Sequence, residues 1–250
     1  MAIFSSAKSF LSVVLRDNSC KFHYRKLNGK KITDEKTDEF IFTEDSELAA
    51  TLTKFIDLNE KRLTSTVLID DKTQNVVFEM VNEDGIICQE VDKDFFVCFS
   101  QNLVDRANEL FGIKFDSCIS LFRVLYILIT NQHFAETAMY ALKFSDKIAF
   151  LVADKDKVSY ANIVSTKDSF IDDSDPDEMF FEILKDEIDK FYADHKSDFI
   201  NNIFIYSDGS LGNEIGYVIF SRIFVKTNLI YVDFADFINK IAIKESIKRH

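Results

Sequence analysis

The chain has 250 residues and a formal net charge of −12, with 47% hydrophobic and 29% charged residues. This composition is typical of a globular protein, and the acidic balance argues against a nucleic-acid partner, which usually needs a basic face. The length allows one large domain or two small ones. The chain has only six glycines, so it offers few places for loops in which backbone amides hold a phosphate.

Neither a signal peptide nor a membrane span is expected. The first 19 residues lack a small-residue cleavage site after a clean apolar core. The longest strongly apolar run, residues 118–130, is interrupted by Arg123 and is shorter than the roughly 20 residues that cross a bilayer.

The cysteines and histidines give no sign of a disulfide framework or a metal site. The four cysteines show no paired spacing, so we expect reduced thiols in a cytosolic protein. No histidine has a Cys or His neighbour at ligand spacing, and no metal-binding residue is predicted. These residues are Cys20, Cys88, Cys98 and Cys118, and His23, His133, His195 and His250.

Alternating apolar residues predict that the chain opens with antiparallel strands, followed by an amphipathic helix within residues 44–61, capped by Asp45 or Ser46. The Asn28-Gly29 pair is a hairpin turn signal. Further strands and a helix that stops at Gly112 follow, and residues 120–130 are predicted to be a buried helix because the run exceeds the usual strand length. The expected strands are residues 10–16, 20–26, 38–42, 65–70, 75–81 and 94–100, and the helix is residues 100–112.

After Lys143 the pattern begins again with two strands around the turn 154–157. The order of the second half is predicted to be β-β-α-β-α-β-α, and the first half opens with a similar hairpin and helix. We therefore expect two α/β halves, residues 1–143 and 144–250, each with a twisted sheet and flanking helices. The later elements are expected at residues 177–193 (helix), 201–207 (strand), 211–224 (helix), 228–233 (strand) and 233–250 (helix).

Three stretches in this order resemble the actin-like fold of sugar kinases, heat-shock ATPases and actin. More narrowly, they resemble the PilM family of type IV pilus assembly and the cytoplasmic part of type II secretion GspL proteins. The stretches are residues 103–130, 146–164 and 182–242. The resemblance implies an actin-like (ribonuclease H-like) duplicated α/β domain with two mixed sheets and flanking helices.

The sequence departs from active members of that fold at both phosphate hairpins. In those proteins the first hairpin turn carries an Asp and a Gly that meet the phosphates and the metal, and the second repeats them. Here the first turn has Asp17 but no glycine, and Arg16 precedes the aspartate. The second turn has Asp154 followed by Lys155, Asp156 and Lys157, again without a glycine. Asp is common in ordinary hairpin turns, so we interpret both residues as turn formers.

The stretch "IYSDGSLGNEIG", residues 205–216, lies where the actin-like families have their adenosine-side glycine loop. We interpret it as a remnant kept for its turn. Gly209 is expected to supply the turn and Asp208 or Ser210 to cap the next helix, while Gly212 and Gly216 would allow close helix packing.

Other candidate sites have simpler explanations. Asp173, Asp175 and Asp177 alternate like a calcium loop, but the glycine and the last glutamate of such a loop are missing. Asp175 followed by Pro176 instead predicts a helix N-terminus. Ser210 has no nucleophile motif around it. Most phenylalanines are expected in the core; four on edge elements remain candidates to line a partner groove, and these are Phe40, Phe42, Phe95 and Phe96.

The sequence thus predicts a non-catalytic scaffold without a cofactor, a pseudo-ATPase, for which no catalytic, cofactor-binding or metal residue is named. The resemblance implies a cytoplasmic protein, peripheral to the inner membrane, in a bacterial envelope machine such as a type IV pilus, type II secretion or flagellar motor assembly. Its partners would be the cytoplasmic N-terminal tail of an inner-membrane protein, other subunits and, in a ring, copies of itself. Two alternatives stay open: a divergent actin-like ATPase or small-molecule kinase using ATP and Mg²⁺ near Asp17 or Asp154, and an ordinary α/β interaction domain.

Overall fold

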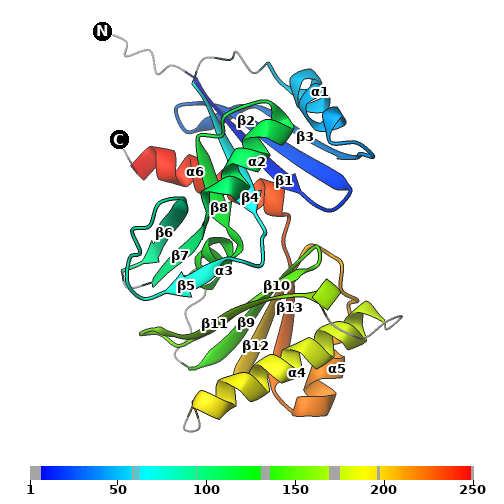
Figure 1. The fold of residues 1–250 in the computed structure, drawn as a ribbon. Coiled ribbons are helices and arrows are strands. Elements are labelled where there is room, and N and C mark those ends of the chain that lie inside the picture. Colours follow the sequence, from blue (N-terminus) through cyan, green and yellow to red (C-terminus); the bar gives the residue numbers. More distant parts are fainter. Residues whose placement is uncertain are drawn as a thin grey trace. The chain divides into compact units, whose positions relative to one another are not determined.

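The computed structural model describes most of the chain, and its elements form two compact units, each discontinuous in sequence (Figure 1). Unit 1 comprises residues 1–69, 101–119 and 233–250, and unit 2 comprises residues 70–100 and 120–232. The described residues are 7–57, 60, 62–93, 95–130, 136–168, 175–195 and 198–248.

Unit 1 is built on a five-stranded sheet of order β3-β2-β1-β4-β8. The neighbours β1, β2 and β3 are antiparallel, and β1 and β4 are parallel, so the sheet is mixed. Gly29 adopts a φ of 63° in the turn between β2 and β3, as the Asn-Gly signal predicts. The strands are β1 (Lys8–Leu15), β2 (Ser19–Asn28), β3 (Lys31–Ile41), β4 (Leu63–Ile69) and β8 (Ser117–Ser120).

Helices cover both faces of this sheet. Helices α1 (Ser46–Phe55) and α2 (Gln101–Phe111) pack on the face of Phe22, whose ring centroid lies 5.3 Å from that of Phe55 and 6.1 Å from that of Phe111. Helix α6 (Phe234–Lys248) packs on the other face, where the Ser12 hydroxyl donates to the Ala235 carbonyl at 2.7 Å.

The larger sheet of unit 2 has the order β11-β10-β9-β12-β13. Its first three strands along the chain are antiparallel, whereas β12 is parallel to β9 and β13. The two strands expected around the turn 154–157 are confirmed as β10 and β11. The strands are β9 (Ala138–Phe144), β10 (Lys147–Ala153), β11 (Val158–Ser165), β12 (Asn202–Ser207) and β13 (Lys226–Tyr231).

Helices α4 (Pro176–Asp194) and α5 (Ile215–Ile223) bury their apolar stripes against one face of this sheet, in a cluster that includes Phe150, Phe180 and Ile219. Helix α3 (Leu121–Thr130) packs on β9 and β10 outside that cluster, and so covers the opposite face (Figure 1). The buried-helix prediction for residues 120–130 is therefore confirmed. A short 3-10 helix, η1 (Thr166–Asp168), follows β11.

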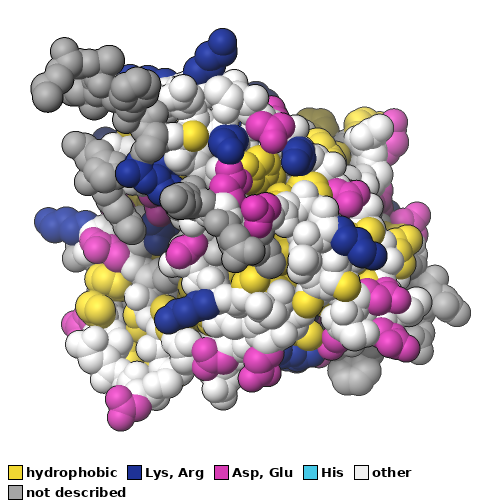
Figure 2. Space-filling view, turned by 90° about the horizontal axis from the view of Figure 1, so that it is seen from above, with side chains coloured by type: hydrophobic (Ala, Val, Ile, Leu, Met, Phe, Trp, Pro, Cys, Tyr) yellow, Lys and Arg dark blue, Asp and Glu magenta, His cyan; other side chains and the backbone are white. Residues whose placement is uncertain are grey.

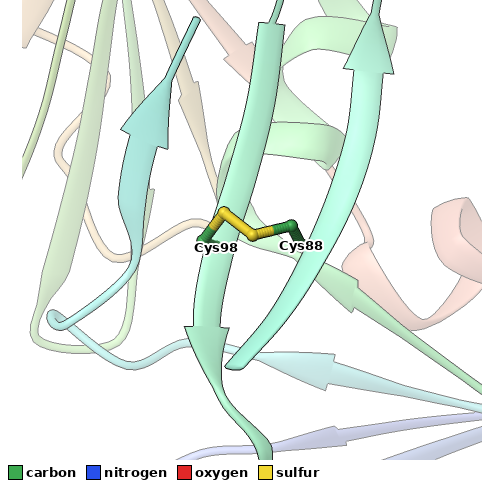
Figure 3. The surroundings of a disulfide bond; sticks show 2 residues. All are labelled: Cys88 and Cys98. Carbon is green, nitrogen blue, oxygen red and sulfur yellow. A yellow bond between two sulfur atoms is a disulfide. The ribbon is translucent and has the colours of Figure 1, made fainter. Parts of the chain in front are cut away.

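Unit 2 also contains a small three-stranded sheet of order β5-β7-β6. Its strands are β5 (Asn75–Val77), β6 (Ile86–Asp92) and β7 (Phe95–Ser100). Cys88 on β6 and Cys98 on β7 face each other in the strand register and form a disulfide (Figure 3). The expectation that all four cysteines are reduced is therefore wrong, and Cys20 and Cys118 alone are free thiols among the described cysteines.

The strands of each large sheet and the helices that follow them are connected in the same order along the chain. We call these two successions of elements the first series (β1 to α3) and the second series (β9 to α6). Each runs β-β-β-α-β-α-β-α, and the small sheet is inserted after β4 in the first. Strand β9, which opens the second series, was not among the predicted strands, and the proposed division between residues 143 and 144 falls inside it. The closing helix of each series belongs to the unit built on the other series' sheet: α3 lies in unit 2 and α6 in unit 1.

Among the described residues, no helix is both long and apolar enough to cross a membrane. Figure 2 shows acidic and basic side chains interspersed, with hydrophobic atoms between them, on the face that it presents.

Candidate functional site

The turn between β1 and β2 is where the first phosphate hairpin would lie. The Arg16 backbone N–H donates to the Ser19 carbonyl at 2.8 Å, and the Phe42 N–H donates to the Asn18 carbonyl at 3.0 Å. Asp17 is exposed at the tip. The turn is closed by backbone hydrogen bonds and, lacking glycine, has no position that lets a phosphate approach the chain closely.

The turn between β10 and β11 is closed by the side chain of Asp154. Its Oδ1 accepts hydrogen bonds from the backbone N–H groups of Asp156 at 2.7 Å and Lys157 at 2.9 Å. Those are the amides that a phosphate would need, and a carboxylate of the protein already holds them. Asp154 therefore acts as a turn former in this structure.

The glycine loop after β12 uses its amides in the same way. Gly209 has a φ of 93°, which confirms that it supplies the turn. Its N–H donates to the Ser207 hydroxyl at 3.2 Å, and the Ser210 N–H donates to the Asp208 carboxylate at 3.2 Å. The expected cap is wrong, because α5 begins only after Glu214, beyond both Asp208 and Ser210.

Gly212 and Asp177 form a contact that joins this loop to the start of α4. The Gly212 N–H donates to Asp177 Oδ1 at 2.8 Å. A Cβ at residue 212 would overlap with Asp177 Oδ2, so the contact requires glycine. Gly216 has no such neighbour, since its nearest contact would be the Thr227 carbonyl oxygen at 3.7 Å. The sequence showed the glycine but not its partner, which lies 35 residues earlier.

The N-terminus of α4 is a capped helix start, as predicted. Asp175 is the N-cap, its carboxylate accepts from the Asp177 N–H at 3.0 Å, and Pro176 begins the helix. Asp173 lies outside the described residues. Because Asp175 and Asp177 are engaged in the cap and in the Gly212 contact, we assign them no calcium site.

A polar cluster around the buried His23 and Arg25 in unit 1 was not predicted. Arg25 donates to Glu35 at 2.6 Å and to Asp236 at 2.5 Å, and His23 lies 3.1 Å from the same Glu35 oxygen. Burial, with the neighbouring Arg25 charge, lowers the pKa of His23. Burial opposes ionisation of Asp236, but the hydrogen bonds from Lys240 and Arg25 hold its pKa below the usual value.

His23, Glu35 and Asp236 also have the spacing of metal ligands, with their ligand atoms within 4.8 Å of one another. Arg25 pairs with both carboxylates and Lys240 pairs with Asp236, so two cations already balance the two carboxylates, and the Arg25 charge would repel a metal ion. The cluster therefore anchors α6 to the sheet, and we do not assign it as a metal site.

Unit 2 has an acidic group beyond the end of β4. Burial raises the pKa of Asp70 to about 6, against the opposing charge of Lys147. The neighbouring Asp146 differs, because it accepts from Lys147 at 2.6 Å and from the Ser165 hydroxyl at 2.8 Å. These contacts outweigh burial and lower the pKa of Asp146.

A pocket of about 260 Å³ in unit 2 lies beside the second hairpin, with Asp154 and Lys155 in its lining. At its side the Tyr126 hydroxyl donates to Asp92, and burial together with this contact raises the pKa of Tyr126. Its lining, among the residues that the structure describes, holds three aspartates and two lysines, so the pocket has no cationic excess to attract a phosphate.

The four candidate phenylalanines are divided between the two units. Phe40 and Phe42 belong to unit 1, with ring centroids 6.3 Å apart, and Phe95 and Phe96 belong to unit 2. Phe42 and Phe95 are buried, so they serve the cores rather than a partner groove.

Comparison with known proteins identifies the fold. The model of a domain of unknown function, DUF8341, matches residues 165–246, from the end of β11 into α6. No curated protein sequence matches the chain.

Three solved structures share the fold at low sequence identity. A Bacteroides thetaiotaomicron protein with an actin-like ATPase fold and unknown function has a TM-score of 0.59 and 15% identity, over 97% of this chain and 98% of its own. The PilM-PilN type IV pilus biogenesis complex gives 0.58 and 9%, over 88% and 87%. MreB5 of Spiroplasma citri bound to ADP gives 0.54 and 6%, over 97% and 98%.

At these identities the likeness establishes the architecture alone. It confirms the fold expected from the sequence, while a PilM or GspL type within it stays a proposal. The protein has an actin-like α/β fold with two mixed sheets and flanking helices.

Proposed function

We propose that the protein is a non-catalytic, nucleotide-independent actin-like scaffold that binds a segment of a partner protein. The main support is that carboxylates of the protein already accept hydrogen bonds from the backbone amides that a phosphate would use. Asp154 holds those of the second hairpin, and Asp177 holds that of Gly212 in the glycine loop. A phosphate would have to displace these carboxylates, and their charge would repel it.

The likeness to PilM supports the kind of partner. The solved PilM structure is a complex with PilN in type IV pilus biogenesis. By that likeness we propose an inner-membrane partner whose N-terminal tail recruits this protein to the cytoplasmic side of the membrane. The assembly would be an envelope machine of the pilus, type II secretion or flagellar motor kind, with other subunits or a ring of copies around it.

Titration calorimetry with ATP·Mg²⁺ tests the absence of nucleotide binding. We expect no binding heat at millimolar nucleotide, with the ADP-binding MreB5 of Spiroplasma citri as the positive control. Micromolar binding that Asp154→Ala weakens would overturn the proposal in favour of a divergent ATPase or kinase with Asp154 near its Mg²⁺.

Chemical crosslinking in cells followed by affinity purification tests the partner. We expect recovery of a single-span membrane protein crosslinked through its N-terminal tail. Recovery of no membrane protein would remove the envelope role and leave an ordinary α/β interaction domain.

The Cys88–Cys98 disulfide bears on the proposed location, because disulfides persist mainly in oxidising compartments. The proposed cytoplasmic location therefore requires this pair to be reduced in the cell. Maleimide labelling of thiols during denaturing lysis, read by mass, tests the location. Labelling of all four cysteines would support the cytoplasmic location, and labelling of Cys20 and Cys118 alone, the two free thiols of the structure, would reject it without touching the scaffold proposal.

A further inference from the structure

A groove of about 450 Å³ in unit 1 lies between the β2–β3 hairpin and the last turns of α6. Its apolar side chains come from both sides: Leu27 and Ile32 from the hairpin, Ile243 and Ile247 from the helix. Ile32 is 45% exposed and Ile247 is 50% exposed, so half of each side chain is left to solvent although both lie in a concave site. Concave apolar sites of this size are typical of binding sites.

The cations around the groove are of two kinds. Arg25 and Lys240 are balanced by two carboxylates: both pair with Asp236 at 2.5 Å, and Arg25 also pairs with Glu35 at 2.6 Å. The side-chain ammonium groups of the other three make no ion pair or hydrogen bond with any described residue, and these are Lys30, Lys244 and Lys248. Lys244 and Lys248 are one helical turn apart on α6, so their ammonium groups lie along the same edge.

The charge of this groove is opposite to that of the chain. No aspartate or glutamate is among its described lining residues, whereas the whole chain carries a net charge of −12. Aliphatic lysine stems extend the apolar surface while their charged heads stay in water. The groove therefore offers an apolar floor with a cationic rim.

We propose that this groove binds an acidic amphipathic segment of a partner protein, with apolar side chains on the floor and carboxylates at Lys30, Lys244 and Lys248. The proposal rests on the scaffold function and names the chemistry of its partner. The concave shape favours a peptide, whose side chains enter a groove, over a flat bilayer. The cationic rim would also repel the Lys- and Arg-rich residues that flank membrane spans on the cytoplasmic side. If the partner spans the membrane, the segment that binds the groove is therefore a different part of its chain from those flanking residues.

A random peptide library displayed on phage, with segments of about three helical turns, provides the test, and the full-length protein is the target. We expect selected peptides to combine acidic residues with bulky apolar ones. Their affinity should fall at least about tenfold in the double variant Lys244→Glu/Lys248→Glu, because each reversal replaces an attraction by a repulsion. Binding should also weaken when salt is raised from about 50 to about 500 mM, the range over which exposed charges become screened.

Matched variants separate the floor from the rim. Ile247→Ser should weaken the same peptides, whereas Lys155→Glu/Lys157→Glu, on the exposed turn of unit 2, should leave their affinity unchanged. Circular dichroism melting confirms that each variant is folded. Enrichment of neutral or basic peptides, no enrichment, or equal loss in the unit 2 variant would each overturn the proposal.

Two further arms identify other occupants. In the first, the protein is sedimented with phosphatidylglycerol vesicles. If it binds the vesicles, if Lys244→Glu/Lys248→Glu abolishes that binding, and if no peptide is selected, the groove binds a membrane surface and the peptide proposal is wrong. In the second, the selection is repeated with ATP·Mg²⁺ present, so that failure of the scaffold proposal and failure of the groove proposal can be told apart. If the protein binds nucleotide and still binds the peptides, only its nucleotide independence is rejected. If it binds neither nucleotide nor peptides, only the peptide-binding groove is rejected.

Discussion

Helices α3 and α6 close the two equivalent series of the chain, but they are held on their sheets by different interactions. In unit 2, α3 lies on β9 and β10 through apolar side chains such as Leu125, which is fully buried. In unit 1, α6 carries the fully buried Asn239, whose amide donates to the Phe10 carbonyl at 3.0 Å and the His23 carbonyl at 3.1 Å.

The difference shows how one topology is stabilised in two ways. Apolar burial is non-directional, so it stabilises α3 on the sheet without selecting one register of the helix. Hydrogen bonds from Asn239 are directional and are satisfied at one register of α6, with Arg25 and Asp236 fixing the same end of the helix. The C-terminal turns of α6, which form one wall of the lysine-rimmed groove, are positioned by this network.

Removing apolar volume under α3 should have the largest effect. Leu125→Ala deletes a fully buried side chain and leaves a cavity, which should lower the free energy of unfolding by about 3–4 kcal/mol. Urea unfolding followed by circular dichroism measures this. Leu128→Ala is the matched control, because the same atoms are removed from a partly exposed position of the same helix, and it should cost about 1 kcal/mol. Equal losses in the two variants would contradict an apolar anchor.

Removing the amide under α6 should cost slightly less but act through a different cause. Asn239→Leu keeps the branching of the side chain and removes both amide hydrogen bonds, so that the His23 carbonyl retains the Ser12 hydroxyl as its side-chain donor and the Phe10 carbonyl loses that of Asn239. The substitution should cost about 2–3 kcal/mol. Amide hydrogen exchange should show the loss in β1, β2 and α6 first. Unchanged stability would mean that α6, like α3, is held by apolar packing alone.

The sequence predicted α3 but not the α6 network, for a physical reason. Run length and apolar content are local properties, and they identify residues 120–130 as a buried helix without any partner. Asn239 and His23 instead look like ordinary polar positions on amphipathic elements, because their burial depends on which sheet face α6 covers. That choice is made by tertiary packing.

Strands β6 and β9 were missed for related reasons. Strand β9 is buried along its whole length and so lacks the alternation that marks a half-exposed strand. Strand β6 was missed because its apolar alternation is weak, and although the ten-residue separation of Cys88 and Cys98 suits two strands of one hairpin, four cysteines allow three pairings. The actin-like order itself was recognisable, since it needs only the sequence of elements.

Acidification should affect the two units in opposite directions. Burial lowers the pKa of His23 below 6.5, so the folded state of unit 1 binds fewer protons than the unfolded state, and its stability falls as the pH drops through 6.5. Burial raises the pKa of Asp70 from 3.8 to about 6, so unit 2 binds more protons when folded. Its stability rises between about pH 7 and about pH 5 by about 1 kcal/mol.

Hydrogen exchange at about pH 7 and about pH 5, corrected for intrinsic rates, measures both trends. Protection should decrease in β1 and β2 and increase in β9 and β10. His23→Gln should flatten the first trend and Asp70→Asn the second, and Asp70→Asn should also stabilise unit 2 at neutral pH. Parallel trends in both units would show that the two buried groups do not control their units' pH dependence.

A smaller effect than those of the two helix variants tests whether unit 2 also contains a directional contact. Gly212→Ala places a Cβ against the Asp177 carboxylate and breaks the hydrogen bond from the Gly212 amide, which should cost about 1–2 kcal/mol. Gly216→Ala is the matched control: it lies within α5, meets nothing closer than 3.7 Å, and should be neutral or stabilise by up to about 1 kcal/mol. Thermal melting compares the two. Because Asp177→Ala removes the overlapping group, it should reduce the cost of Gly212→Ala in a double variant, and full additivity of the two losses would show that residues 177 and 212 act independently.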